Sequence, residues 1–380
     1  MVRPDYSSCT IAIHVPNLNG GGAERMMVNL ANEFVSRDIN VHLVLSQIKG
    51  PYTSEVDDGV DIINLDASTY PGFAAMGALL PLRNYLRQRE PDTLLSALSL
   101  VNIVSLLAHQ SSRVDTRIVV SQRNHLSSIA SNSDNMMKFV PWLVRLTYRW
   151  ADDIIPISEG VADDLQNITG ISSDDMKTIY NPVINNSIAT QANKAPGHPW
   201  LNESKNKLPV ILGVGRLTQQ KDFPTLIKAF SRLQKQQKCR LIILGEGEQK
   251  DYLDKLIKER NIQDSVDMPG FVENPFAYMA RSEVFALSSR WEGFGNVIVE
   301  AMACGTPVVS TDCPSGPAEI LQNGKYGSLV PVGDCDSLAN AIKENLEDPI
   351  SELELKRRAN DFTVSNIAEE YLDILINSDK

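Results

Sequence analysis

Two glutamates lie at the ends of one short, mostly apolar segment, "WEGFGNVIVEAMACGTPVV", residues 291–309. Glu292 precedes a bend made by Gly293 and Gly295, and Glu300 lies about two helical turns beyond that bend. Because the helix after the bend is nearly all apolar, we expect it to be buried. A buried Glu300 then needs hydrogen-bond donors, which either the vicinal hydroxyls of a sugar or a structural salt bridge would supply. Glu292, at the turn, is placed to face a ligand.

A basic pair lies in the stretch "GVGRLTQQKDFPTLIKAF", which begins as a strand and ends as a helix. Arg216 comes just past the strand. Lys221 precedes a helix that we expect to begin near Pro224, with Asp222 as its cap. A planar guanidinium and a compact ammonium in one loop suit a diphosphate. The alternative is a solvated basic loop, since lysine and arginine are common on protein surfaces.

A run of three glycines forms a third candidate site. Gly20, Gly21 and Gly22 follow the first strand and open the first helix. Consecutive glycines let backbone amides approach a ligand closely, and a helix N-terminus favours an anion, so we expect a phosphate here. The dinucleotide fingerprint G-x-G-x-x-G is absent, because Arg25 stands where its last glycine would be. The alternative is a flexible loop.

The elements that must position these residues alternate between strands and helices. Strand-like runs include "TIAIHV", "NVHLVLS" and "RIVVSQ" in the first half and "LPVILGVGR", "CRLIILGEG" and "SEVFALSS" in the second. This alternation predicts an α/β protein with two Rossmann-like domains, each built on a doubly wound parallel sheet, that face each other across a cleft. In such sheets ligands bind beyond the carboxyl ends of the strands, where the candidate loops lie.

A change in composition marks the domain boundaries. We expect an N-terminal domain over residues 1–185, an irregular interdomain linker over 186–207, and a C-terminal domain over 208–380. The last helical run, residues 365–376, has two places open to it, because it could pack on the C-terminal domain or cross back to the N-terminal one.

Composition and charge exclude several classes of protein. A hydrophobic content of 43% with 22% charged residues is that of a globular protein, and a net charge of −11 argues against nonspecific nucleic-acid binding. The five cysteines form no C-x-x-C pair, which favours reduced thiols over a disulfide or zinc framework. We find no secretory signal and no run of about 18 apolar residues, so we expect a cytoplasmic protein.

Taken together, the motifs resemble a known family. The resemblance rests on "GGGAER", "GRLTQQKD", "GFVENPFAYMARSEVFALSSRWEGFGNVIVEAMACGTPVVSTDCPSGPAEIL" and "GSLVPVGD". These stretches are similar to the retaining, nucleotide-sugar-dependent glycosyltransferases of family 4, which have the GT-B fold. The similarity extends over nearly the whole chain and is strongest over residues 213–320. The subgroup that builds capsules, lipopolysaccharide and lipid-linked glycans looks closest.

The resemblance implies a role for each candidate residue. Glu300 would accept hydrogen bonds from the ribose hydroxyls, Glu292 would contact the transferred sugar, and Arg216 with Lys221 would neutralise the diphosphate. In that reading the catalytic residues are Glu292, Arg216 and Lys221. Backbone groups that the family uses for the diphosphate and the base correspond to Gly21, Gly22, Gly293, Phe294, Gly295, Phe271 and Val272.

The implied reaction moves a hexose or N-acetylhexosamine from a nucleoside-diphosphate sugar, UDP-linked in our expectation, to a glycan acceptor that is lipid-linked. We expect no cofactor and no metal, because no D-x-D motif follows a strand in this region and the protein cations would replace the metal. One alternative keeps the fold and makes the chain a sugar-nucleotide isomerase or another GT-B sugar enzyme. A nucleotide-binding oxidoreductase is disfavoured by the missing fingerprint. A silent sugar-nucleotide binder is disfavoured by the intact acidic and basic residues.

The acceptor side is expected in "VVSQRNHL", at the end of a strand in the first domain. Relatives often have a similar Ser-x-Arg-Asn sequence and a nearby histidine, so Arg123, Asn124 and His125 would face the cleft. Structural roles are the alternative for Arg123 and His125, because neutral histidines often make hydrogen bonds in loops.

Basic and aromatic residues are mixed in the stretch "MMKFVPWLVRLTYRW", residues 136–150, which contains no acid. Such a mixture suits an interfacial helix on an anionic membrane, and the alternative is a core helix with a basic edge. The expected basic and apolar members are Lys138, Arg145 and Arg149 with Phe139, Trp142, Leu146 and Trp150. We therefore expect a protein that binds peripherally to the cytoplasmic face of a membrane.

Overall fold

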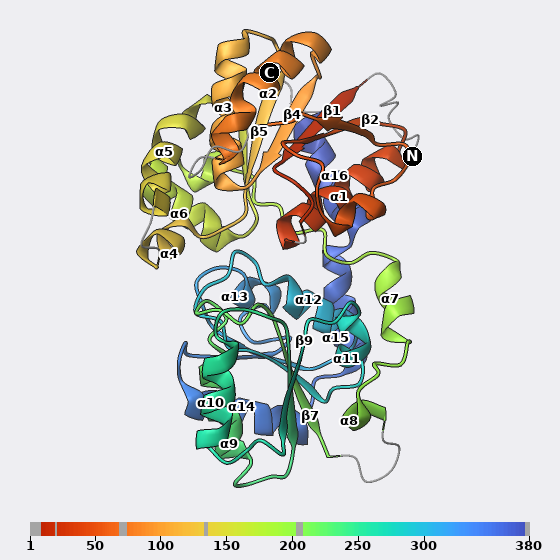
Figure 1. Ribbon diagram of the computed structural model, residues 1–380, viewed down its shortest axis with the longest axis vertical. Coiled ribbons are helices and arrows are strands. Elements are labelled where there is room, and N and C mark those ends of the chain that lie inside the picture. The colour runs from red at the N-terminus through yellow and green to blue at the C-terminus, as the bar shows by residue number, and fades with distance from the viewer. Residues whose placement is uncertain (1–8, 20, 68–73, 133–135, 203–207, 377–380) are drawn as a thin grey trace. The chain divides into compact units, whose positions relative to one another are not determined.

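A computed structural model describes residues 9–19, 21–67, 74–132, 136–202 and 208–376 of this chain (Figure 1). The chain divides into two compact units. Their residues are Met1–Pro182 with Val364–Lys380 for the first unit, and Val183–Thr363 for the second.

The first unit is built on a six-stranded parallel sheet with the order β3-β2-β1-β4-β5-β6. Its strands are β1 (Thr10–Val15), β2 (Asn40–Leu45), β3 (Asp61–Asn64), β4 (Thr93–Ala97), β5 (Arg117–Gln122) and β6 (Asp153–Pro156). The strand order reverses between β1 and β4, as in a doubly wound Rossmann sheet. Five of the six residues of β1 are buried, which is expected for a parallel strand covered by helices on both faces.

Helices flank the first sheet (Figure 1). They are α1 (Gly22–Val35), α2 (Leu79–Arg89), α3 (Ser99–Ser112), α4 (Leu126–Ser131), α5 (Val140–Thr147), α6 (Glu159–Thr169) and α16 (Val364–Leu375). Short 3-10 turns are η1 (Pro51–Glu55), η2 (Ala74–Ala78), η3 (Met136–Phe139), η4 (Tyr148–Trp150) and η5 (Ser173–Asp175).

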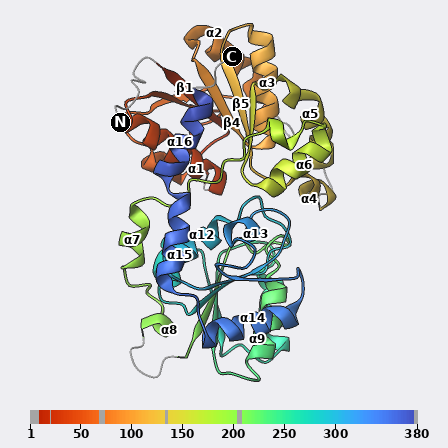
Figure 2. The same cartoon turned by 180° about the vertical axis from the view of Figure 1, so that it is seen from behind.

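The last helix, α16, is part of the first unit. It packs against α1, and both ribbon views show the two helices side by side (Figure 2). The Thr93 hydroxyl at the start of β4 donates to the carbonyl of Leu375 over 2.8 Å, and Arg37 donates to the carbonyl of Ser365 over 2.7 Å. The chain therefore leaves the first unit at residue 183 and returns to it at residue 364.

The second unit has a six-stranded parallel sheet with the order β12-β11-β10-β7-β8-β9. Its strands are β7 (Val210–Val214), β8 (Arg240–Leu244), β9 (Val266–Gly270), β10 (Val284–Leu287), β11 (Val308–Thr311) and β12 (Ser328–Val330). Counted along the chain, this is the same order as in the first sheet, and it reverses between β7 and β10. The expected pair of doubly wound parallel sheets is thus confirmed in both units.

The helices of the second unit are α7 (Ser187–Ala192), α8 (Pro199–Asn202), α9 (Phe223–Leu233), α10 (Lys250–Glu259), α11 (Pro275–Met279), α12 (Asn296–Ala303), α13 (Pro317–Ile320), α14 (Cys335–Glu347), α15 (Glu352–Ala359) and the 3-10 turn η6 (Asn360–Phe362). Amphipathic α9 packs beside α14 and buries Leu226 and Phe230 in a core with Ile211, Ile243 and Leu338. Burial of each large apolar side chain contributes about 1.5–3 kcal/mol, so this core fixes the strand ends that carry the site.

The described part of the expected linker, residues 186–202, is ordered against the second unit instead of forming an irregular connection. Asn274 donates to the carbonyl of Gln191 over 2.9 Å, and Arg281 donates to the carbonyl of Ala192 over 2.8 Å. Farther along, Nε2 of His198 lies 2.8 Å from the Asp267 carboxylate. Hydrogen bonds between residues far apart in the sequence thus hold this segment against the second unit. Its polar composition did not indicate these bonds. Residues 203–207 lie outside the described part of the chain.

Candidate active site

The loops that follow β7 and β10 meet where the order of the second sheet reverses. The Gln220 side chain donates to the carbonyl of Trp291 over 2.9 Å, and the amide of Arg290 donates to the carbonyl of Gln220 over 2.8 Å. The Ser288 hydroxyl donates to the carbonyl of Lys221 over 2.8 Å. These bonds hold the two candidate loops, which are about 70 residues apart in sequence, against each other at the edge of the sheet where doubly wound folds bind ligands.

Lys221 and Glu292 form an ion pair at this junction. The Nζ of Lys221 lies 2.6 Å from Oε1 of Glu292, with the two side chains 14% and 8% exposed. The Ser289 hydroxyl donates to the same Oε1 over 2.6 Å. Within the described residues, the Arg216 side chain makes no hydrogen bond or ion pair, and it is exposed. The two expected diphosphate cations therefore differ: Lys221 is paired inside the unit, and Arg216 is exposed and has no side-chain partner among the described residues.

The expectation that Glu300 is the buried acid was wrong, because Glu292 is 7% exposed whereas Glu300 is only half-buried. The helix α12 shows the reason. Ile298, Val299, Ala301 and Met302 are buried, while the partly exposed positions recur on the face that carries Glu300. An apolar composition therefore concealed a helix with one partly open face.

Asp222 does not cap α9 with its side chain, contrary to expectation. Its backbone is left-handed, with φ 45°, and its carboxylate points elsewhere. Its Oδ2 accepts from Nε of Arg290 over 3.1 Å and from the Thr225 hydroxyl over 2.9 Å. Asp222 thus adds a further link between the two loops.

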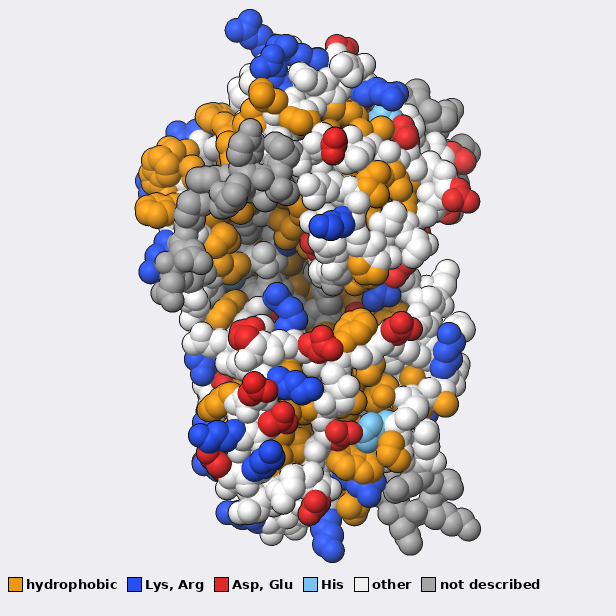
Figure 3. Space-filling view, viewed as in Figure 1, with side chains coloured by type: hydrophobic (Ala, Val, Ile, Leu, Met, Phe, Trp, Pro, Cys, Tyr) orange, Lys and Arg blue, Asp and Glu red, His pale blue; other side chains and the backbone are white. Residues whose placement is uncertain are grey.

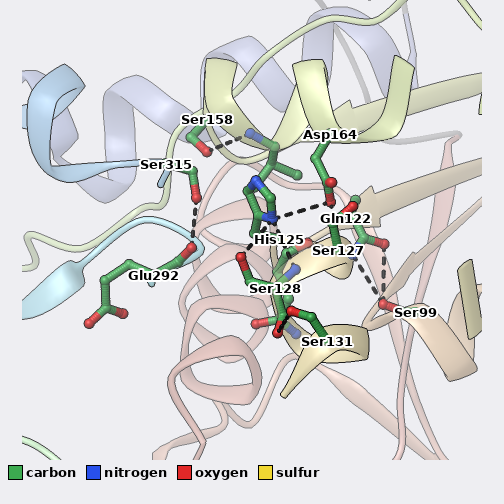
Figure 4. A network of polar contacts seen from close by, with 12 residues as sticks. Ser99, Gln122, His125, Ser127, Ser128, Ser131, Ser158, Asp164, Glu292 and Ser315 are labelled. Carbon is green, nitrogen blue, oxygen red and sulfur yellow. Dashed lines mark hydrogen bonds and ion pairs between the residues drawn. The ribbon is translucent and has the colours of Figure 1, made fainter. Parts of the chain in front are cut away.

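The glycine turn before α12 is braced by the loop after β11. The Ser315 hydroxyl donates to the carbonyl of Glu292 over 2.6 Å, as Figure 4 shows. Gly316 has φ 91°, and a Cβ there would lie 1.8 Å from the carbonyl oxygen of Phe294, so no larger residue fits. Gly295, with φ 99°, precedes the first residue of α12.

The side chain of Phe294 points into the core, where it is 2% exposed and its ring centroid lies 5.6 Å from that of Phe362. The Phe294 side chain is therefore part of the core and does not line the surface of the turn that also includes Gly293. After β9, Phe271 is 72% exposed and Val272 is partly exposed, so this loop too is open to solvent.

In the first unit, α1 begins at Gly22 with Gly21 as its N-cap in an extended conformation. A Cβ at Gly21 would lie 2.1 Å from a carboxylate oxygen of Glu24. The helix start therefore has an acid of its own beside it, which a phosphate at this loop would have to meet. Gly20 lies outside the described residues.

Arg123 is buried in the first unit, contrary to the expectation that it faces a cleft. It is 4% exposed, and its guanidinium donates to Asn181 over 2.6 Å and to the Ser121 hydroxyl over 3.4 Å. The pKa of the guanidinium is lowered because it is buried, and the Tyr371 hydroxyl and the Glu24 carboxylate offset only part of this shift. These contacts join β5 to the segment before residue 183 and to α16.

His125 caps the short helix α4. Its Nδ1 accepts from the backbone N–H of Ser128 over 3.3 Å and lies 3.6 Å from the Asp164 carboxylate (Figure 4). Because Nδ1 accepts, a neutral ring carries its proton on Nε2. Asn124 is partly exposed, and its carbonyl accepts from Gln122 over 2.8 Å. The loop hydrogen bond that was the alternative for His125 is thus present.

Three serines around the ion pair were not singled out from the sequence. Ser288, Ser289 and Ser315 bind the Lys221 carbonyl, the Glu292 carboxylate and the Glu292 carbonyl, respectively. The signal available was "ALSSRWEG", in which two small polar residues end an apolar strand directly before the acidic turn. Across the described ranges, we find no group of three His, Cys, Asp or Glu side chains that could hold a metal ion.

Two family descriptions match the chain: "Glycosyltransferase Family 4" over residues 20–185 and "Glycosyl transferases group 1" over residues 198–362. Among curated relatives, the N-acetylgalactosamine-N,N'-diacetylbacillosaminyl-diphospho-undecaprenol 4-alpha-N-acetylgalactosaminyltransferase of Campylobacter jejuni is 33% identical, over 96% of this chain and 99% of the relative. The lipopolysaccharide core biosynthesis glycosyltransferase LpsE of Rhizobium meliloti is 26% identical, over 93% of this chain and 96% of LpsE.

Solved structures share the fold. Anabaena HepE in complex with UDP-glucose matches with a TM-score of 0.79 at 21% identity, over 97% of this chain and 100% of that chain. The apo form of the lipopolysaccharide outer core galactosyltransferase WaaB matches with a TM-score of 0.75 at 19% identity, over 97% of this chain and 99% of WaaB.

Proposed function

This chain belongs to the family 4 and group 1 glycosyltransferases of the GT-B fold, and on that premise we propose that it moves a hexose or N-acetylhexosamine from a nucleoside-diphosphate sugar to a glycan acceptor, with retention of configuration. The observation that carries the proposal is the junction of the loops after β7 and β10. It brings Arg216, Lys221 and Glu292 to the strand ends at which a doubly wound sheet binds its ligand.

The proposed chemistry needs positive charge at the leaving group. As the bond from the anomeric carbon to the phosphate oxygen breaks, negative charge grows on the departing diphosphate. Arg216, Lys221 and the amides of the turn at Gly293 and Gly295 would stabilise that charge, in place of a metal ion. Each well-placed group of this kind is worth about 2.7–4 kcal/mol. The acceptor oxygen attacks from the same face, and its proton passes to the leaving phosphate, so no protein base is required.

We take UDP as the carrier of the sugar, with Glu300 at the ribose and the exposed loop at Phe271 and Val272 beside the base. The partly exposed face of α12 is compatible with this assignment, because Glu300 is accessible there. HepE, a neighbour in fold, is solved with UDP-glucose. On the first unit, we place the acceptor near Asn124 and His125, with Arg123 behind them holding β5.

We propose that the acceptor is a lipid-linked glycan. The Campylobacter jejuni relative is named for a diphospho-undecaprenol acceptor, and LpsE for lipopolysaccharide core synthesis. A lipid-linked acceptor is presented at a membrane surface, so the enzyme that uses it gains from binding there. The described helices include none long and apolar enough to cross a bilayer.

A face of the first unit suits such peripheral binding. On the segment from η3 to η4 the exposed apolar side chains and their exposed fractions are Phe139 66%, Trp142 60%, Leu146 39% and Trp150 38%. Lys138, Arg145 and Arg149 are exposed on the same segment. The side of the first unit that carries α5 shows apolar and basic side chains together (Figure 3). We call these seven residues the aromatic–basic face and propose that it contacts anionic lipid.

We place the enzyme on the cytoplasmic side of that membrane. All five cysteines are unpaired, and burial raises the pKa of the Cys239, Cys304 and Cys313 thiols to about 12. Unpaired, inert thiols are typical of a reducing compartment.

A UDP-release assay over a panel of sugar nucleotides, with and without short lipid-linked glycans, tests the function. Release that depends on both donor and acceptor, with a lengthened glycan whose new linkage keeps the donor's anomeric configuration, is the expected result. A converted sugar nucleotide formed without any glycan would instead identify a sugar-nucleotide isomerase. Binding without turnover across the panel would identify a silent binder.

A further inference from the structure

The lysine that the proposed function assigns to the diphosphate already has a counter-ion. Its Nζ lies 2.6 Å from the Glu292 carboxylate, and both side chains are largely shielded from water. The carboxylate neutralises most of the positive charge of Lys221, so an anion can bind this lysine strongly only if the Glu292 carboxylate moves away from it. Arg216 is different, because it is exposed and has no side-chain partner in the described residues.

We infer that Glu292 is the resting counter-ion of Lys221 and that the donor diphosphate displaces it, which frees the carboxylate for the hydroxyls of the sugar. This inference rests on the proposed function. Arg216, which is exposed and has no side-chain partner in the part of the chain that the structure describes, makes the first contact with the diphosphate. Recognition of the phosphate and recognition of the sugar are thereby coupled through one ion pair.

The coupling separates a sugar nucleotide from a bare nucleoside diphosphate. Either ligand can replace Glu292 at Lys221, but only the sugar nucleotide brings hydroxyl donors for the displaced carboxylate. With the bare diphosphate, a largely buried carboxylate loses its cation and gains nothing, which is costly. Glu292 thus weakens binding of the product relative to the donor and favours product release.

Ser289 is the positioning residue in this exchange. It is fully buried, its hydroxyl donates to Oε1 of Glu292 over 2.6 Å, and its own carbonyl accepts from the Thr311 hydroxyl over 2.6 Å. It is therefore a fixed donor that stays with the carboxylate after Lys221 has moved to the phosphate. Removing it makes the displaced state less favourable.

The test measures the affinity of inorganic pyrophosphate and of UDP by calorimetry, in the wild type and in two variants. Glu292→Gln removes the competing charge and keeps the shape, so both ligands should bind about tenfold tighter, as expected for release of a close charge pair. Ser289→Ala should weaken the binding of pyrophosphate and of UDP severalfold. A Lys221→Met change added to Glu292→Gln should abolish the gain.

Opposite signs in the two variants distinguish displacement from a purely structural role, which would weaken binding in both. Glu292→Gln that binds pyrophosphate no tighter than wild type overturns the inference. If that variant fails to fold, Ser289→Ala with unchanged or tighter binding overturns it alone. The matched control is Glu352→Gln, which breaks the exposed pair of Glu352 with Lys356 in the same unit and should leave pyrophosphate affinity unchanged.

The outcome is separable from that of the proposed function. Wild-type turnover of sugar nucleotides tests the function, and the sign of the affinity changes tests the displacement. An enzyme that transfers sugar but shows the wrong signs keeps its function and loses the inference. Displacement without any transfer would keep the ion-pair exchange and remove the enzyme assignment.

Discussion

The two units share one strand order but not the chemistry at the point where that order reverses. In the second unit, the loops beyond β7 and β10 hold the charged pair Lys221 and Glu292. In the first unit, the strand β1 holds a neutral group, His14, which is 1% exposed. Its ring nitrogens lie 2.9 Å from the Ser105 hydroxyl and 3.3 Å from the Ser46 hydroxyl.

Neutral hydrogen bonds continue across the first sheet. The Tyr148 hydroxyl donates to Gln122 over 2.6 Å and accepts from Asn102 over 2.9 Å. Topology therefore fixes where a site can form, and the side chains at the strand ends decide what it can bind. The charged pair Lys221 and Glu292 suits a diphosphate, whereas His14 and Tyr148 in the first unit offer only neutral hydrogen-bonding groups.

The sharpest test of this contrast is Lys221→Ala. Loss of the cation that we assign to the leaving group should lower kcat/KM by about 100- to 1,000-fold with the fold intact. Steady-state kinetics with the preferred sugar nucleotide and circular dichroism measure the two quantities. Lys356→Ala, which removes a lysine from an exposed pair, is the control. Turnover within threefold of wild type in Lys221→Ala would remove the charged site from the reaction.

A second test asks whether membrane binding belongs to the first unit alone. Changing Lys138, Arg145 and Arg149 together to Gln should lower partitioning onto anionic vesicles by about 100-fold, at about 1 kcal/mol for each charge. Sedimentation with phosphatidylglycerol vesicles at low salt measures the loss.

The matched control for that test lies on α10 of the second unit. Lys250, Lys255 and Lys258 are exposed there, and their change to Gln removes the same charge from a helix that has one aromatic residue, Tyr252, and no exposed Trp or Phe. Equal losses in the two triple variants would show that net charge, and not the aromatic–basic face, governs binding.

A conservative change at the buried Arg123 should destabilise the first unit and leave the second unit unaffected. Arg123→Lys cannot keep both the bond to Asn181 and the bond to Ser121, so it should destabilise the first unit by about 2 kcal/mol. Native-state hydrogen exchange can follow the two sheets separately. Protection should fall in β5 and stay unchanged in β7; an equal loss in both sheets would contradict a role confined to the first unit.

An effect of similar size, but dependent on pH, comes from the neutral group His14 of the first unit. Burial lowers the pKa of His14 to about 3. In the unfolded chain the pKa of a histidine is about 6.5, so the unfolded chain binds the proton at a higher pH than the folded protein does. The free energy of unfolding is therefore highest above about pH 6.5 and decreases as the pH falls from there toward 3. Between pH 7 and pH 5 this loss should be about 2 kcal/mol. Urea titrations at several pH values measure the free energy of unfolding of wild type and of His14→Gln. An equal dependence of this free energy on pH in the two proteins would contradict the prediction.

Much of the fold could be predicted from the sequence, because alternating strands and helices leave few topologies for a parallel sheet. Local patterns also pointed to Arg216, Lys221 and Glu292. The pairing of Lys221 with Glu292 could not be predicted, since it depends on two distant loops meeting. The burial of Arg123 and the partly open face at Glu300 were missed for the same reason: each is set by neighbours from other elements.

The return of α16 to the first unit has a consequence for biosynthesis. Every residue of the second unit leaves the ribosome before α16 does, so the second unit can complete its fold first. The first unit, although its sheet is made earliest, must wait for the segment that bonds to Thr93 and Arg37. A chain that ends at residue 363 and has been released from the ribosome would therefore carry all of the second unit and a first unit without α16.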